Sequence, residues 1–151
     1  MLKGIATAAD AALALEHGVD VIWVSNHGGR QLDHGLGTID MLPEIVDTVG
    51  GNAEIIVDGG VQRGSDVVKA VALGAKAVAI GKLQSWGLAA NGTAGAVRVL
   101  EILEEEMRIA MGLIGVTSID QLNPSFVCKA EPVTHPHEMS SWVNMPGERM
   151  L

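Results

Sequence analysis

The chain has 151 residues, of which 48% are hydrophobic and 19% are charged. This composition excludes a disordered chain, which combines low hydrophobicity with dense charge, and the length suits a single domain. The formal net charge of -8 argues against nucleic acid and anionic membrane surfaces as partners, because both attract basic proteins.

Four short apolar segments predict β-strands. The first, Met1–Lys3, is only the stub of a strand, and the others are Val19–Val24, Glu54–Val57 and Ala77–Ile80. Each of the last three is rich in apolar residues and ends at a turn that contains glycine or polar residues. Such runs are typical of strands that are buried on both faces of a parallel sheet.

Helical patterns lie between and after these strands. Their starts are marked by residues that commonly cap helices, and most of their ends by glycine. We expect the helices Ala8–Glu16 capped by Thr7, Ile39–Val49 capped by Thr38, Asp66–Leu73 opened by Gly64 or Ser65, a longer helix near Ala94–Met111, and a short one over Val116–Leu122.

The alternation of strands and helices predicts an α/β fold with parallel strands. We expect this region to cover residues 1–122. From residue 123 to residue 151 the chain holds four of its five prolines and little periodicity, so we expect an arm or tail, which we predict wraps a neighbouring subunit.

Two cellular properties follow from simpler features. The single cysteine, Cys128, cannot form an internal disulfide, which favours a reducing cytoplasm. No apolar run reaches the roughly 20 residues that a membrane span requires.

A metal site is not expected either, because His135, His137 and Glu138 have no further ligands around them in the sequence.

Polar residues and glycines gather at the carboxyl ends of the predicted strands, where parallel β/α proteins place their active sites. After one strand, His27 and Arg30 are three residues apart. A neutral imidazole can accept a proton, and a guanidinium can bind a carboxylate with two hydrogen bonds. The pair suits proton abstraction from a small anion. Alternatively, His27 only fills a turn and Arg30 pairs with Asp33 on the surface.

The glycines at the other strand ends suggest a phosphate site. Backbone N–H groups of Gly59, Gly60 and Gly81, with helix N-termini behind them, suit a phosphate. Alternatively, these glycines only make tight turns.

Three motifs together resemble one family, the FMN-dependent 2-hydroxy acid dehydrogenases and oxidases. The segment Val24–Asp33, with Ser25-Asn26-His27-Gly28-Gly29-Arg30-Gln31, resembles the signature around the family's catalytic histidine. Val57-Asp58-Gly59-Gly60-Val61 and the segment from Leu73 to Gly81 follow in the same order and spacing. The resemblance covers residues 2–122 and implies the C-terminal half, strands five to eight, of a TIM (β/α)8 barrel.

The resemblance also assigns roles. His27 would be the base that removes a substrate proton, and Arg30 would hold the substrate carboxylate. Lys3 would offset negative charge on the reduced flavin, and Ser25 would contact the flavin. The remaining FMN-binding residues, at the ribityl chain and phosphate, would be Asp58, Gly59, Gly60, Val61, Gln62, Gly81 and Lys82.

Two positions depart from the family's pattern. Gln62 and Lys82 stand where the family usually has arginine. Lysine keeps a charge but loses the two-pronged hydrogen bonding of arginine, and glutamine loses the charge as well. We therefore expect reduced FMN affinity.

The greater departure is length, because a complete barrel takes about 250 residues. Two active-site tyrosines and the aspartate that orients the histidine belong to the other half, and the chain has no tyrosine. We expect the half-barrel to pair with a second copy of itself or with an N-terminal half. The expected function is FMN-dependent oxidation of a 2-hydroxy acid to a 2-oxo acid. The alternatives are a non-catalytic half-barrel that binds FMN or phosphate, and another phosphate-binding barrel, which the His27–Arg30 pair disfavours.

Overall fold

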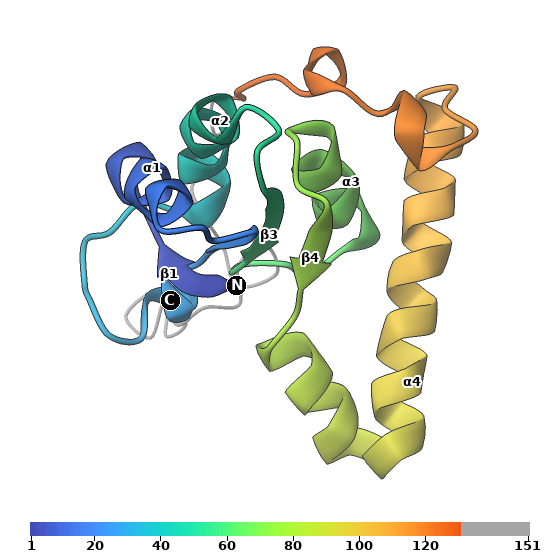
Figure 1. The fold of residues 1–151 in the computed structure, drawn as a ribbon. Coiled ribbons are helices and arrows are strands. Elements are labelled where there is room, and N and C mark those ends of the chain that lie inside the picture. Colours follow the sequence, from blue (N-terminus) through green and yellow to red (C-terminus); the bar gives the residue numbers. More distant parts are fainter. Residues whose placement is uncertain (131–151) are drawn as a thin grey trace, which may run out of the picture.

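A computed structural model describes residues 1–130 of the chain and shows a four-stranded parallel sheet with its strands in chain order. Helices connect consecutive strands (Figure 1). The strands and helices, in chain order, are β1 Leu2–Ile5, α1 Ala8–Glu16, β2 Val21–Val24, α2 Thr38–Val49, β3 Glu54–Asp58, α3 Gly64–Ala72, β4 Ala77–Ala79 and α4 Lys82–Leu113. Three short 3-10 turns add to these at His27–Gly29 (η1), Ile119–Gln121 and Pro124–Phe126.

The register of the strands aligns their carboxyl ends. Lys3 of β1 lies beside Trp23 of β2, which in turn lies beside Ile56 of β3. Asp58, the last residue of β3, pairs with Ala79, the last residue of β4. The segments that follow β2, β3 and β4 therefore begin side by side at the carboxyl ends of the strands, as the sequence predicted.

The core lies on one face of the sheet. Alternate strand residues such as Ile22, Val24 and Val57 are buried there against α1 and α2. Because successive side chains of a strand point to opposite faces, Lys3 and Trp23 point to the other face, where they remain partly exposed. That other face carries the polar residues described below.

The helix ends agree with the sequence at α1 but not at α2. The Thr7 hydroxyl accepts a hydrogen bond from the Asp10 amide at 3.1 Å, which caps α1 as predicted. At α2 the prediction that Thr38 is the cap is wrong, because Gly37 precedes a helix that already includes Thr38. The Thr38 hydroxyl instead donates to the main-chain carbonyl of Asp58, the last residue of β3.

Helix α4 is longer than expected and is broken. It begins at Lys82 rather than near residue 94, and Asn91 and Gly92 depart from helical geometry. The first part runs away from the sheet, and the second returns beside α3 (Figure 1). The two parts of α4 cross closely at Gly87 and Gly95. A Cβ on Gly87 would lie 2.6 Å from the Gly95 carbonyl oxygen, so glycine permits the close approach. Gly87 in the first part and Gly92 at the break interrupt the helical pattern in the sequence.

The chain after α4 has little regular structure within the described residues. The helix predicted over Val116–Leu122 is a single 3-10 turn, Ile119–Gln121, preceded by Ser118. The predicted arm begins with a second turn, Pro124–Phe126, which contacts α3. Residues 131–151 lie outside the described residues, as do the two histidines considered for a metal site, and so the division at residue 122 stays a prediction. None of the helices in residues 1–130 is both long and apolar enough to cross a membrane.

Candidate active site at the carboxyl ends of the strands

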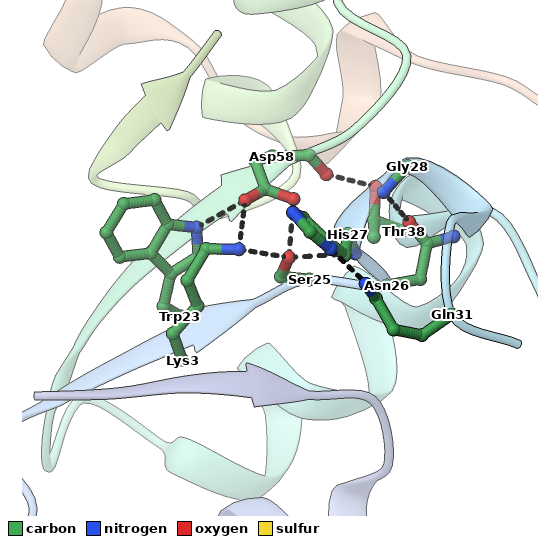
Figure 2. A network of polar contacts seen from close by, with 9 residues as sticks. All are labelled: Lys3, Trp23, Ser25, Asn26, His27, Gly28, Gln31, Thr38 and Asp58. Atoms are coloured by element: carbon green, nitrogen blue, oxygen red, sulfur yellow. Dashed lines mark hydrogen bonds and ion pairs between the residues drawn. The ribbon is translucent and has the colours of Figure 1, made fainter. Parts of the chain in front are cut away.

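Three of the predicted site residues, Lys3, Ser25 and Asp58, come together in one cluster (Figure 2). The Lys3 ammonium lies 2.8 Å from the Ser25 hydroxyl and 3.0 Å from Asp58 Oδ2. The Ser25 hydroxyl donates to Asp58 Oδ1 at 2.7 Å. The cluster thus joins three neighbouring strands by their side chains.

Trp23 is a fourth member that the sequence analysis missed. Its indole N–H donates to Asp58 Oδ2 at 3.0 Å, and the Lys3 ammonium lies 5.2 Å from the centre of its ring. That distance allows a favourable interaction between the cation and the ring. Strand alternation contained the signal, because Trp23 is two residues before Ser25 and therefore on the same face.

The turn after β2 holds His27 in a left-handed conformation, with a φ of 56°. That conformation costs a residue with a side chain roughly 1–2 kcal/mol. Asn26 stabilises the turn, because its Oδ1 accepts from the Gly28 amide at 2.9 Å and its Nδ2 donates to the Leu36 carbonyl at 3.0 Å. The His27 amide donates to the Ser25 hydroxyl at 3.1 Å.

Gln31 contacts the ring of His27, another contact that the sequence analysis missed. Nδ1 of His27 lies against Oε1 of Gln31 (Figure 2). A carbonyl oxygen only accepts hydrogen bonds, so a neutral His27 with its proton on Nδ1 would donate to Gln31. Nε2 is then the nitrogen able to accept a proton.

Arg30 follows this turn and is exposed. The alternative in which Arg30 pairs with Asp33 is not found, since no ion pair among residues 1–130 includes Arg30. Its guanidinium is therefore available to an anion from solution.

The loop between β3 and α3 contains the predicted glycines. Gly59 has a φ of +97°, and a Cβ there would lie 2.9 Å from the Thr38 hydroxyl, so both geometry and space require glycine. The backbone N–H groups of Gly60 and Val61 have no hydrogen-bond partner among the described residues. They remain available as donors to a ligand.

The N-terminus of α3 is not available in the same way. The amides of Gln62 and Arg63 donate to Asp66 Oδ2 at 3.1 and 3.0 Å, and the Gly64 amide donates to Glu106 of α4 at 2.7 Å. Two carboxylates therefore occupy the positive end of this helix. The expectation that a helix N-terminus supports a phosphate behind Gly59 and Gly60 is wrong for α3.

Arg63 turns away from the predicted phosphate site. Its guanidinium meets Glu106 through Nε at 2.8 Å and Nη2 at 2.7 Å. The Arg63 hydrogen bond, together with the Gly64 amide, lowers the pKa of Glu106 below its usual range. The same hydrogen bond, helped by the charge of Glu106, raises the pKa of Arg63. Arg63 therefore does not replace the arginine that is absent at Gln62.

Gly81 and Lys82 stand apart from the cluster. Lys82 is exposed at the start of α4, and no hydrogen bond or ion pair of the described residues joins it to Lys3 or Asp58. Residues 1–130 contain no group of three or more His, Cys, Asp or Glu side chains that could hold a metal ion.

Residues 1–129 match the model of a family described as FMN-dependent dehydrogenase. The chain belongs to this FMN-dependent dehydrogenase family. It is 50% identical over 127 residues to an L-lactate oxidase of Nostoc sp., covering 84% of this chain and 35% of that protein. It is 52% identical over 127 residues to human 2-hydroxyacid oxidase 1, covering 84% and 34% respectively.

A structural match agrees with this membership. A mandelate oxidase solved with benzoyl-formic acid superposes with a TM-score of 0.76 and 52% identity, covering 79% of this chain and 36% of that one. The chain thus spans about a third of the length of the curated relatives that it matches. The family match includes every site residue from Lys3 to Lys82.

The residues present fit the family's cofactor, FMN, which combines a flavin ring with a polyhydroxylated chain and a phosphate. An ammonium has three N–H donors, and Lys3 uses two of them on Ser25 and Asp58, so one remains for a ligand. The free amides of Gly60 and Val61 and the charge of Lys82 add donors that suit an anion.

Proposed function

We propose that this chain supplies the base, the carboxylate anchor and the phosphate-binding loop of an enzyme that oxidises a 2-hydroxy acid to a 2-oxo acid. FMN, when bound, accepts the two electrons that the substrate loses. Membership in the FMN-dependent dehydrogenase family supports this proposal. The observation that carries it is the hydrogen-bonded cluster of Lys3, Ser25 and Asp58, which reaches the main chain of His27 (Figure 2).

In this proposal a neutral His27 carries its proton on Nδ1, beside Oε1 of Gln31, and accepts a substrate proton at Nε2. Arg30 binds the substrate carboxylate by two parallel hydrogen bonds. Lys3, with one N–H donor left over, would be the residue that binds the flavin ring and offsets negative charge on it. In the family resemblance Ser25 is a flavin-binding residue, and the segment from Asp58 to Gln62, with Gly81 and Lys82, would hold the ribityl chain and phosphate, with the free amides of Gly60 and Val61 and the Lys82 ammonium as donors.

We further propose that the four β/α units are strands five to eight of an eight-stranded barrel. The parallel strand order and the coverage of only about a third of each relative support this arrangement. A sheet of this kind exposes unpaired main-chain groups at β1 and β4, its two edges. A second half-barrel, either another copy or an N-terminal half, would pair with both edges and supply the rest of the site.

The first test is whether the purified chain retains a flavin absorption band after saturation with FMN and removal of free flavin. A flavin-loaded chain, alone or mixed with an N-terminal half, should then be reduced by a 2-hydroxy acid such as lactate or mandelate. His27→Gln should retain the flavin and reduce this rate by about 10²–10⁴, the usual contribution of general base catalysis.

Three outcomes bear on the proposal. An unchanged rate in His27→Gln would exclude His27 as the base. Flavin retention without reduction by any 2-hydroxy acid, even with the other half present, would favour the non-catalytic alternative. No retention of flavin under either condition would overturn the proposed function and leave only the alternative of a half-barrel that binds phosphate.

A further inference from the structure

The hydroxyl of Ser25 uses all of its hydrogen-bonding capacity within the chain. It donates to Asp58 at 2.7 Å and accepts from the Lys3 ammonium at 2.8 Å and the His27 amide at 3.1 Å. A hydroxyl has one donor and two acceptor positions, so none remains. Ser25 is also 96% buried, with only 4% of its surface exposed. Its hydroxyl therefore bridges Asp58, Lys3 and His27 within the chain.

Asp58 is held as firmly as Ser25. Its carboxylate accepts from the Trp23 indole and the Lys3 ammonium at Oδ2, and from Ser25 at Oδ1. Its main-chain carbonyl accepts from the Thr38 hydroxyl. These bonds come from three other elements, β1, β2 and α2, so they fix both the side chain and the backbone at the end of β3.

His27 needs such support, because a left-handed residue with a side chain persists only where its surroundings hold it. Its amide bond to Ser25 is the direct link between its main chain and the cluster. Lys3 reaches the same hydroxyl from the opposite side (Figure 2). Ser25 is the shared contact between the two.

We propose that Ser25 and Asp58 are positioning residues that couple the Lys3 ammonium to the main chain of His27. Asp58 orients the Ser25 hydroxyl by accepting its hydrogen bond, which directs the two acceptor positions of the hydroxyl oxygen toward Lys3 and His27. The cation expected at the flavin and the base expected at the substrate are thereby held in one geometry. The significance of this coupling for catalysis rests on the proposed function, but the coupling itself does not require flavin.

The test uses NMR of the whole chain without flavin. Ser25→Ala removes the shared hydroxyl and should speed hydrogen exchange of the His27 amide about tenfold, with a change in the Cα shift that reports its φ. Ser25→Thr keeps a hydroxyl and should restore slow exchange. Ser65→Ala makes the same change in α3, away from the cluster, and should leave both signals unchanged.

Two further variants leave the buried Ser25 side chain unchanged. Lys3 is 43% exposed at its side chain, so Lys3→Met should preserve the fold and still shift the His27 amide resonance through Ser25. Asp58→Asn should do the same. Unchanged His27 signals in Lys3→Met and Asp58→Asn would overturn the coupling, whether or not Ser25→Ala folds.

Binding of FMN separates the two proposals. If the wild-type chain binds no FMN, alone or mixed with an N-terminal half, but the His27 signals respond as described, the proposed function fails and the coupling stands. If FMN binds, Lys3→Met should raise its dissociation constant. Ser25→Ala should then lower kcat with a smaller change in the KM of the 2-hydroxy acid, since Arg30 remains.

Discussion

At the scale of single residues, the candidate site is a hydrogen-bond network in which most donor and acceptor positions are already used. Ser25 and Asp58 are saturated or nearly so, whereas Lys3, Gly60 and Val61 keep donors for a ligand. The free donors are the positions available to a ligand. The saturated groups identify the positions at which a substitution disturbs the site indirectly.

The phosphate site offers the first prediction at this scale. Gln62→Arg combined with Lys82→Arg should lower the FMN dissociation constant by about tenfold, because a guanidinium binds phosphate with two charge-assisted hydrogen bonds. Titration of flavin fluorescence with the apoprotein measures this change. Lys76→Arg, an exposed position before β4, is the matched control and should have no effect. Equal affinities of the double variant and the wild type would contradict the prediction.

At the scale of elements, α3 and α4 are joined more closely than any other pair of helices. Gly64 lets the start of α3 meet the backbone of α4 at Leu103 and Met107. Glu106 then caps α3 through the Gly64 amide and pairs with Arg63. This joint fixes the end of the loop that carries Gly60 and Val61.

Glu106→Gln should destabilise the chain at pH 7, and the difference from wild type should shrink as the pH falls. The pKa of Glu106 is lowered in the folded chain, so its stabilising effect is complete above the unfolded value of about 4.3. That effect is lost as the pH falls through the folded value. Urea unfolding at several pH values measures it. Glu105→Gln, at an exposed neighbour, should show no such pH-dependent difference.

The break in α4 gives a second prediction for an element. Gly95→Ala should destabilise the chain by about 1–3 kcal/mol, because the new methyl group would overlap the Gly87 carbonyl. Gly112→Ala lies in the same helix with open space around it and should stabilise by about 0.5–1 kcal/mol. Thermal unfolding of both variants tests the close crossing, and a neutral Gly95→Ala would exclude it.

At the scale of the whole molecule, an apolar cavity lies beside β4. A cavity of about 210 Å³ between α3, β4 and α4 is lined mainly by Val67, Val78, Ile80, Leu100, Leu103 and Met107. It lies beside an edge strand and away from the Lys3 cluster. In the proposed half-barrel, this is one of the two edges at which the other half attaches.

Leu100→Asp should therefore weaken assembly with a second half-barrel while leaving the chain folded, because Leu100 is 56% exposed. Light scattering after size exclusion, on the chain alone and mixed with an N-terminal half, measures the assembly. Leu113→Asp changes an 83% exposed residue of the same helix that does not line the cavity, and it should assemble normally. Equal assembly of both variants would place the contact elsewhere.

The sequence by itself determined the features that depend on neighbouring residues. The Thr7 cap, the alternation of strands and helices, and the gathering of Lys3, Ser25 and Asp58 at strand ends all follow from local patterns and parallel order. The family motifs added the membership that the comparison confirmed. These inferences hold because the hydrogen bonds of caps and helices join residues close in sequence.

Only the tertiary structure decided which distant groups meet. Thr38 donates to Asp58 instead of capping its own helix, Arg63 pairs with Glu106 of α4, and Trp23 joins the cluster. Each of these contacts spans 20 or more residues of sequence. A polar side chain has several potential partners, and the register of the sheet and the packing of α4 on α3 determine which of them it reaches.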